Sequence, residues 1–227
     1  MQATISWPGR LVREVLQPPT LAVLDLFAPA AVEGRDALDA LAGPVLLAAN
    51  HTSHLDTPVI LHALLPARRR RVAVAAAADY FFTRPRLGAV VALLFGAVPF
   101  GRGRSARVSL NDCAGLLRGG WSVLLYPEGT RTTSGRIGPF RPGVGFLAVE
   151  LGVPVVPIRT EGLFDVFPKG RRLPHPGRVT VHFGAPLWFA GDVSHRAATA
   201  TIEAAVRTLG SAEPAQEGGR DGRNLSH

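Results

Sequence analysis

Residues 44–56 read PVLLAANHTSHLD, and this stretch decides the fold. The apolar run 44–49 predicts a buried strand. At its end the chain supplies Asn50, His51 and, five residues after the histidine, Asp56. Because neighbours on one helix face are three or four residues apart, we place His51 in the turn and Asp56 in the first turn of the next helix. A carboxylate there can accept one ring N–H of His51, fix the tautomer and leave the other nitrogen as a base.

The rest of the chain alternates apolar runs with helical patterns, which predicts an α/β fold with a mixed, largely buried sheet flanked by helices. Residues 72–78 are expected to form a strand or the start of a helix, and the uncharged residues 87–100 a core or interfacial helix. The other expected strands are 30–34, 121–126, 153–158 and 178–183. The other expected helices are 35–41, 57–65, 105–118, 143–151 and 194–209. Two prolines in 153–158 predict an edge strand or an irregular one.

The predicted organisation has three parts. Residues 1–29 are expected to be helical but broken at Pro18-Pro19, and to form either a lid on the core or an amphipathic membrane anchor. Residues 30–210 are expected to form a single domain, and the polar, Gly-rich residues 211–227 a disordered tail. We find no signal-peptide pattern and no apolar run long enough to span a bilayer.

Composition narrows the classes of partner. The formal net charge of +8 favours an anionic partner, which could be nucleic acid, an anionic membrane face or a phosphorylated substrate. Aromatic residues make up only 7% and do not interleave with a basic stretch, so nucleic acid is not favoured. The single cysteine, Cys113, excludes an internal disulfide framework and a cysteine-based zinc cluster.

Several residues after the apolar segment suit anion binding. Arg102 follows the uncharged segment 87–100, and Arg131 follows a glycine turn after the expected strand 121–126. Arginine binds phosphate through a planar fork, and Gly129 allows the backbone to approach a ligand closely. Glu128 would repel a phosphate, so we expect it to orient Arg131 or to accept a hydrogen bond from a ligand hydroxyl.

These residues resemble motifs of a known family. Residues 50–56 resemble the N-H-x-x-x-x-D motif of the glycerolipid acyltransferases related to 1-acylglycerol-3-phosphate acyltransferase. The second motif is matched by residues 96–102, the third by YPEGTR at 126–131 with FRPG at 140–143, and the fourth by VPVVPI at 153–158. The matches occur in family order and extend over residues 31–184.

The resemblance implies transfer of a fatty acyl group from acyl-CoA or acyl-carrier protein to a lysophospholipid hydroxyl, without a cofactor or metal. It assigns the base to His51 and its partner to Asp56. It assigns the glycerol phosphate to Arg102, Glu128, Gly129 and Arg131. Support, or the acyl-donor side, is assigned to Asn50, Arg104, Arg141 and Pro157.

The chain departs from the family pattern in its second motif and after its third. Pro99-Phe100-Gly101-Arg102 lacks the usual acid of the second motif, which leaves Arg104 as a competing phosphate ligand. Arg141 stands where a lysine is usual, and keeps the charge. We expect lysophosphatidate as acceptor, and an enzyme lying peripherally on the cytoplasmic face of an anionic membrane.

Four alternatives stay open at the level of sequence. The acceptor could be another lysolipid, or the protein could be a non-enzymatic basic module that binds membranes or lipids. Ser53 could act as a hydrolytic nucleophile, although no Gly-x-Ser-x-Gly elbow surrounds it. His51, His54 and Asp56 could ligate a metal, although no further ligand pair is identified.

Overall fold

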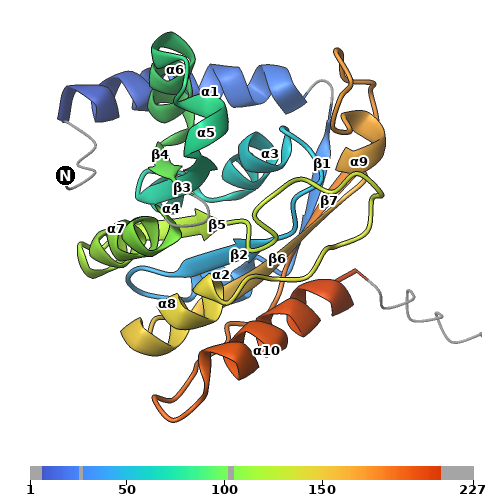
Figure 1. Ribbon diagram of the computed structural model, residues 1–227. Helices are drawn as coiled ribbons and strands as arrows, with labels where there is room; N and C mark the ends of the chain where they lie inside the picture. The colour runs from blue at the N-terminus through green and yellow to red at the C-terminus, as the bar shows by residue number, and fades with distance from the viewer. Residues whose placement is uncertain (1–6, 26–27, 102–104, 211–227) are drawn as a thin grey trace, which may run out of the picture.

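The computed structural model describes residues 7–25, 28–101 and 105–210 (Figure 1). The expected tail, 211–227, lies outside these residues. A seven-stranded sheet has the order β1-β7-β6-β2-β5-β3-β4, and only the β6–β7 pair is antiparallel. Its strands are β1 Ala30–Glu33, β2 Leu46–Ala49, β3 Val72–Ala77, β4 Ala97–Phe100, β5 Ser122–Leu125, β6 Val155–Glu161 and β7 Val179–Phe183. The fold is therefore mixed α/β, as predicted.

Strand β2 lies at the centre of the sheet and is buried on both faces. Leu46 pairs with Val123 of β5 and with Val155 of β6. Leu47 and Ala49 belong to the core on one face, whereas Leu46 and Ala48 belong to the core on the other. Because alternate residues of a strand point to opposite faces, this explains why 44–49 is apolar without alternation.

Helices cover both faces of the sheet (Figure 1). One core contains residues of α1, α2, α3 and α9, and the other contains residues of α7, α8 and α10. The helices are α1 Trp7–Asp25, α2 Asp36–Asp39, α3 Asp56–Ala63, α4 Pro66–Arg69, α5 Ala78–Phe81, α6 Pro85–Phe95, α7 Ala106–Arg118, α8 Gly143–Leu151, α9 Leu163–Val166 and α10 His195–Thr208.

The expected break at Pro18-Pro19 is wrong, because α1 continues through both prolines. Tertiary contacts hold the helix together. The buried Arg13 donates to the carbonyl of Val72 at 3.3 Å, and Gln17 donates to the carbonyl of Leu94 at 2.6 Å. These contacts with distant carbonyls offset the helix bonds that the prolines cannot make.

The single helix expected over residues 87–100 is also wrong. Helix α6 ends at Phe95, and β4 follows as a strand parallel to β3. Gly96 separates them with φ of 65°, a left-handed conformation that ends the helix. The uncharged sequence 97–100 suits a buried strand as well as it suits a helix, so composition could not place this boundary.

The two prolines of 153–158 predicted an edge strand or an irregular one. Strand β6 is not at an edge, because it lies between β2 and β7. Pro157 pairs with Ala48 of β2, and its carbonyl accepts the N–H of Gly184 at 2.8 Å. In a strand the N–H and the C=O of one residue point to the same side, so the N–H that Pro157 lacks would point toward β7, as its carbonyl does. The β6–β7 pairing starts one residue later, at Ile158, so the ladder loses little at Pro157.

Candidate active site

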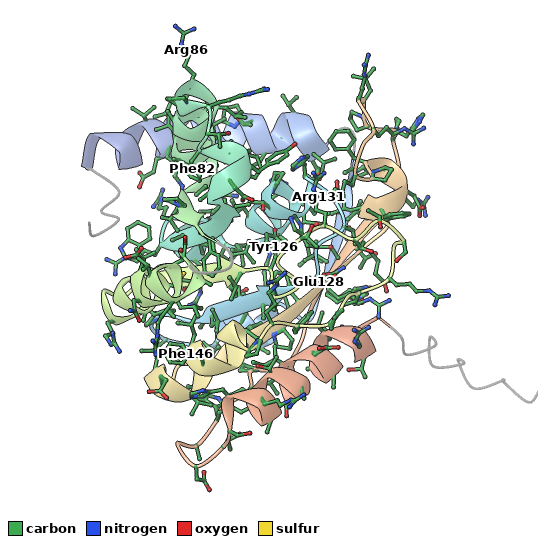
Figure 2. All side chains as sticks on the ribbon, in the orientation of Figure 1. Phe82, Arg86, Tyr126, Glu128, Arg131 and Phe146 are labelled. Atoms are coloured by element: carbon green, nitrogen blue, oxygen red, sulfur yellow. The ribbon has the colours of Figure 1, made fainter. Side chains whose placement is uncertain are left out.

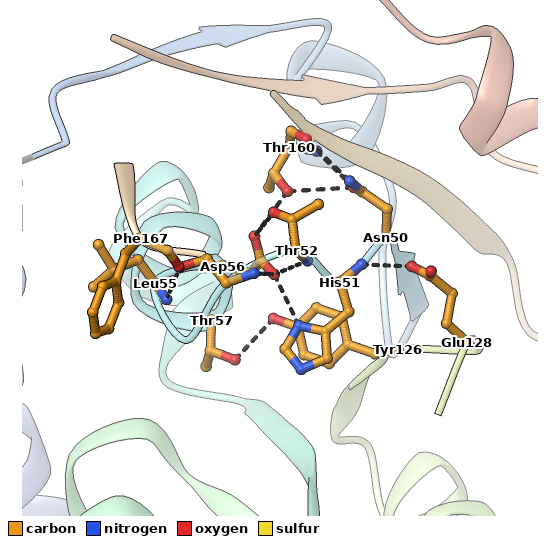
Figure 3. A network of polar contacts seen from close by, with 11 residues as sticks. Asn50, His51, Thr52, Leu55, Asp56, Thr57, Tyr126, Glu128, Thr160 and Phe167 are labelled. Carbon is orange, nitrogen blue, oxygen red and sulfur yellow. Dashed lines mark hydrogen bonds and ion pairs between the residues drawn. The ribbon is translucent and has the colours of Figure 1, made fainter. Parts of the chain in front are cut away.

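The site begins where β2 ends, at Asn50. The Asn50 amide oxygen accepts the backbone N–H of Thr160 at 2.8 Å, and its Nδ2 donates to the Thr160 carbonyl at 3.0 Å. Both residues are buried. This two-way pairing fixes the end of β2 to β6 and sets the direction in which the chain enters the turn (Figure 3). Asn50 therefore supports the site by joining the end of β2 to β6.

Asp56 lies fully buried at the start of α3 and organises the turn around its carboxylate. Oδ2 accepts from the backbone N–H of Thr52 at 2.7 Å and of Ser53 at 2.8 Å, and it lies 2.8 Å from Nδ1 of His51. Oδ1 accepts from the hydroxyls of Thr52 at 3.1 Å and Thr160 at 3.0 Å. A buried carboxylate with these five donors is satisfied as an anion.

The contact with Asp56 determines what the His51 ring can do. A carboxylate can only accept, so Nδ1 of His51 carries the proton and Nε2 is the acceptor. The ring stacks on Tyr126, with centroids 4.1 Å apart and planes inclined by 19°. The Tyr126 hydroxyl lies 2.8 Å from Thr57 Oγ1, and burial raises the pKa of Tyr126 well above its usual value. The His51 ring is thus held by the Asp56 carboxylate at Nδ1 and by the neutral Tyr126 phenol against its face.

Glu128 holds the backbone of His51. Its Oε1 accepts the N–H of His51 at 2.7 Å (Figure 3). Its Oε2 accepts the N–H of Gly138 at 2.7 Å. Burial raises the pKa of Glu128, and these two backbone donors act in the opposite direction. The His51 carbonyl accepts the N–H of Thr132 at 2.9 Å, so the chain after β5 holds the histidine through both of its peptide groups.

The His51 ring opens onto a cavity of about 750 Å³. Its walls are mainly apolar and come from β3, α6, β4 and α7, which would suit a hydrocarbon chain. The larger apolar side chains among them are Val74, Leu87, Val91, Phe95, Phe100 and Leu110. The lining does not include Glu128, whose side chain is buried.

Cations share this cavity with His51. Arg131 and Arg141 both line it, and Figure 2 shows Arg131 above Tyr126 and Glu128. Arg141 also donates from Nε to the Glu128 carbonyl at 3.3 Å. The Gly129 backbone lies in the same lining, with φ of 71°. The anion-binding residues expected from the third motif, apart from Glu128, therefore meet the candidate base in one cavity.

Lys169, which no sequence motif indicated, also lines the cavity. It lies between β6 and β7, more than a hundred residues from His51 in the chain. No spacing or motif connects it to the histidine, so only the folded chain brings the two together.

Two of the expected cations, Arg102 and Arg104, lie outside the described residues. Pro157 is buried in β6 below the turn and does not line the cavity. It can contribute only by supporting the strand next to β2. Roles for these three residues stay predictions.

The geometry disfavours Ser53 as a nucleophile. Ser53 is fully buried, and its hydroxyl donates to the Phe167 carbonyl at 2.7 Å and accepts the N–H of Leu55 at 3.1 Å. The hydroxyl is occupied by backbone groups and does not line the cavity. Within the described part of the chain, His, Cys, Asp and Glu side chains form no group of three that could hold a metal ion.

Residues 30–161 match the family model named Acyltransferase. The chain belongs to this family. It is 32% identical over 160 residues to the 1-acyl-sn-glycerol-3-phosphate acyltransferase BAT2, chloroplastic, of Brassica napus, covering 69% of this chain and 44% of that protein. It is 30% identical over 144 residues to the human 1-acyl-sn-glycerol-3-phosphate acyltransferase beta, covering 62% and 49%. The chain thus spans less than half the length of these two relatives.

The fold also has a solved counterpart. The crystal structure of the 1-acyl-sn-glycerophosphate (LPA) acyltransferase PlsC from Thermotoga maritima superposes with a TM-score of 0.68, over 88% of this chain and 77% of that one. The identity is 24%, so this likeness shows the fold.

Proposed function

We propose that this acyltransferase moves a fatty acyl group from acyl-CoA or acyl-carrier protein to the free hydroxyl of 1-acylglycerol 3-phosphate, giving phosphatidate. One observation carries the proposal. The His51–Asp56 pair opens onto a cavity that combines long apolar walls with arginine side chains. A lysophosphatidate has both features, an acyl chain and an anionic end. The names of the relatives support this acceptor.

The proposed reaction is a direct transfer. Nε2 of His51 takes the proton of the acceptor hydroxyl while that oxygen attacks the thioester carbonyl. The new C–O bond forms, the C–S bond breaks, and the thiolate leaves with the proton that His51 had taken. Asp56 stabilises the imidazolium that exists between these steps, as the acid of a catalytic triad does.

The arginines would align the acceptor. Arg131 and Arg141 are the described arginines in the cavity wall, and we assign them to the phosphate together with the sequence-predicted Arg102 and Arg104. Fixing the phosphate brings the hydroxyl to His51 in one orientation, which lowers the entropic part of the barrier. We assign Glu128 to holding His51, because both of its carboxylate oxygens accept backbone N–H groups.

The test is thiol release from acyl-CoA and acyl-carrier protein with a panel of lysolipids. We expect His51→Ala to abolish acceptor-dependent release. His195→Ala is the matched control, because His195 begins α10, pairs with Glu150 and does not line the cavity. Turnover near wild type in His51→Ala would refute the mechanism, and preference for another lysolipid would refute the acceptor.

We also propose that the enzyme lies peripherally on the cytoplasmic face of an anionic membrane. Among the described residues, every helix is too short or too polar to cross a bilayer. Helix α1 buries Arg13 and Gln17 but exposes Val12, Val15 and Leu16. Apolar side chains are also exposed on the adjacent α6, and Arg86 projects outward from its outer end (Figure 2). Apolar groups beside cations suit an interface of acyl chains and phosphates.

Flotation with vesicles tests this location. We expect binding to vesicles rich in phosphatidylglycerol and weaker binding to phosphatidylcholine alone. Val15→Asp, at a position 71% exposed on α1, should reduce binding, whereas Val108→Asp, at a position 63% exposed on α7, should not. Equal binding of all three proteins would refute the assignment to α1. A non-enzymatic lipid-binding module would instead be favoured by two results together. His51→Ala would still bind vesicles, and the wild-type protein would consume no thioester.

A further inference from the structure

The short helix α5 contributes an aromatic residue, Tyr80, to the cavity that contains His51. Tyr80 lies outside every motif discussed above. The guanidinium carbon of Arg131 lies 5.8 Å from the centre of its ring. A guanidinium at this distance is attracted to the ring, while its five N–H donors stay available in its own plane.

Tyr80 is itself held in place by His54. The Tyr80 hydroxyl lies 3.1 Å from Nε2 of His54, and the centroids of the two rings are 5.3 Å apart. Phe81 packs edge-on against Tyr80 with centroids 4.8 Å apart. These contacts fix the plane of the tyrosine ring although its side chain is half exposed.

His54 can make this contact without placing a second positive charge near Arg131. Burial is the largest cause that lowers the pKa of His54 to about 4, and the positive charge of Arg131 acts in the same direction. The imidazole is therefore neutral at pH 7. The ion pairs of the described residues do not involve Arg131, so its charge is not neutralised by a carboxylate there.

We propose that Tyr80 is a positioning residue, which holds the Arg131 fork toward the anionic group of the acceptor and is itself held by His54. This inference rests on the proposed function, because it assumes an acceptor with a phosphate. It assigns to the second histidine of residues 50–56 a role that neither general-base catalysis nor metal binding requires. It also makes the α5 wall part of acceptor recognition.

The first experiment measures kcat and KM for lysophosphatidate in Tyr80→Ala and Tyr80→Phe. We expect Tyr80→Ala to raise the acceptor KM roughly three- to tenfold with kcat nearly unchanged, because a cation–π contact at a half-exposed site has this strength. Tyr80→Phe keeps the ring and should give a smaller rise. Trp188→Ala removes an aromatic residue that is 63% exposed and should change neither constant.

Two further arms distinguish positioning from other roles. With monoacylglycerol, which lacks the phosphate, Tyr80→Ala should not change the acceptor KM. In an Arg131→Ala background, Tyr80→Ala should have no further effect, because a residue that acts through another has nothing left to position. An equal rise with monoacylglycerol, or an undiminished rise without Arg131, would overturn the inference.

A binding arm separates this inference from the proposed function. Calorimetric titration with glycerol 3-phosphate should give a dissociation constant that rises three- to tenfold in Tyr80→Ala and is unchanged in Trp188→Ala. If wild type binds glycerol 3-phosphate but transfers no acyl group, the proposed function fails and the titration still decides on Tyr80. If wild type does not bind it, or Tyr80→Ala binds it equally well, the inference fails.

Discussion

Replacing Asp56 by asparagine separates the charge of this residue from its shape. Two backbone donors, the N–H groups of Thr52 and Ser53, converge on Oδ2 together with Nδ1 of His51. They favour the amide oxygen at that position, so the tautomer of His51 should be preserved. The amide nitrogen would then face the hydroxyls of Thr52 and Thr160, which can accept as well as donate. Asp56→Asn should therefore fold and keep the ring in place.

The expected loss in Asp56→Asn is electrostatic. Nδ1 of His51 lies 2.8 Å from Oδ2, which places the centres of the two charged groups roughly 4 Å apart in the imidazolium state. At an effective dielectric constant of about 20 this attraction amounts to about 4 kcal/mol. Since about 1.4 kcal/mol is a factor of ten in rate, kcat should fall about a thousandfold. The assay is thiol release at saturating acceptor, with the melting temperature measured in parallel.

Asp56→Ala is the contrasting variant, because it removes the acceptor altogether. It leaves the buried N–H groups of Thr52 and Ser53 without their partner, at about 1–3 kcal/mol each. We therefore expect a much lower melting temperature than in Asp56→Asn. The reasoning would be refuted by an Asp56→Asn enzyme within tenfold of wild-type kcat, or by equal melting temperatures of the two variants.

Three further predictions concern the surroundings of the site. Gly129→Ala should lower the free energy of unfolding by about 1–2 kcal/mol in thermal denaturation, because an alanine would have to keep the left-handed φ of 71°. Its Cβ would also lie 2.6 Å from Arg141 Nε. An unchanged melting temperature would contradict this strain. Cys113 is buried and its pKa is raised to about 12, so Ellman's reagent at pH 8 should react only after unfolding in guanidinium; rapid reaction of the native protein would contradict this. The pKa of His54 is lowered from 6.5 to about 4, so the unfolded chain binds more protons between these values and stability should fall as pH falls from 6.5 to 4. The slope should be smaller in His54→Gln, and an identical slope would assign it to other groups.

The sequence predicted the fold well where the spacing of apolar residues and the helix- or strand-ending residues indicated the same element. Helix α8 coincides with the expected range 143–151, because an apolar face is followed by Gly152 in the left-handed conformation. Strand β2 was expected because an apolar run ends abruptly at polar residues. The errors arose where local propensity was overridden, as at Pro18-Pro19, or where an uncharged run contained two elements, as in 87–100. In both cases the deciding contacts join residues far apart in the chain.

The candidate site was predictable to the extent that it is local. The His51–Asp56 contact lies within one turn, so the five-residue spacing was enough to anticipate it. Lys169 and Tyr80 could not be anticipated, because they reach the cavity from connections after β6 and β3. Their positions depend on the order of strands in the sheet, which the sequence pattern does not specify.

The third motif illustrates how a sequence match can identify a site without showing which way each residue faces. Its residues diverge in the fold, because Glu128 turns inward to the backbone of His51 and Gly138 while Arg131 lines the cavity. Gly129 stands between them with φ of 71°, a conformation that lets the chain reverse direction at this point. The same segment therefore supports the proposed base through Glu128 and places a cation in the cavity wall through Arg131. Coupling both tasks in one turn would keep the base and the anion-binding group in a fixed relation, and the direct transfer proposed here requires that relation.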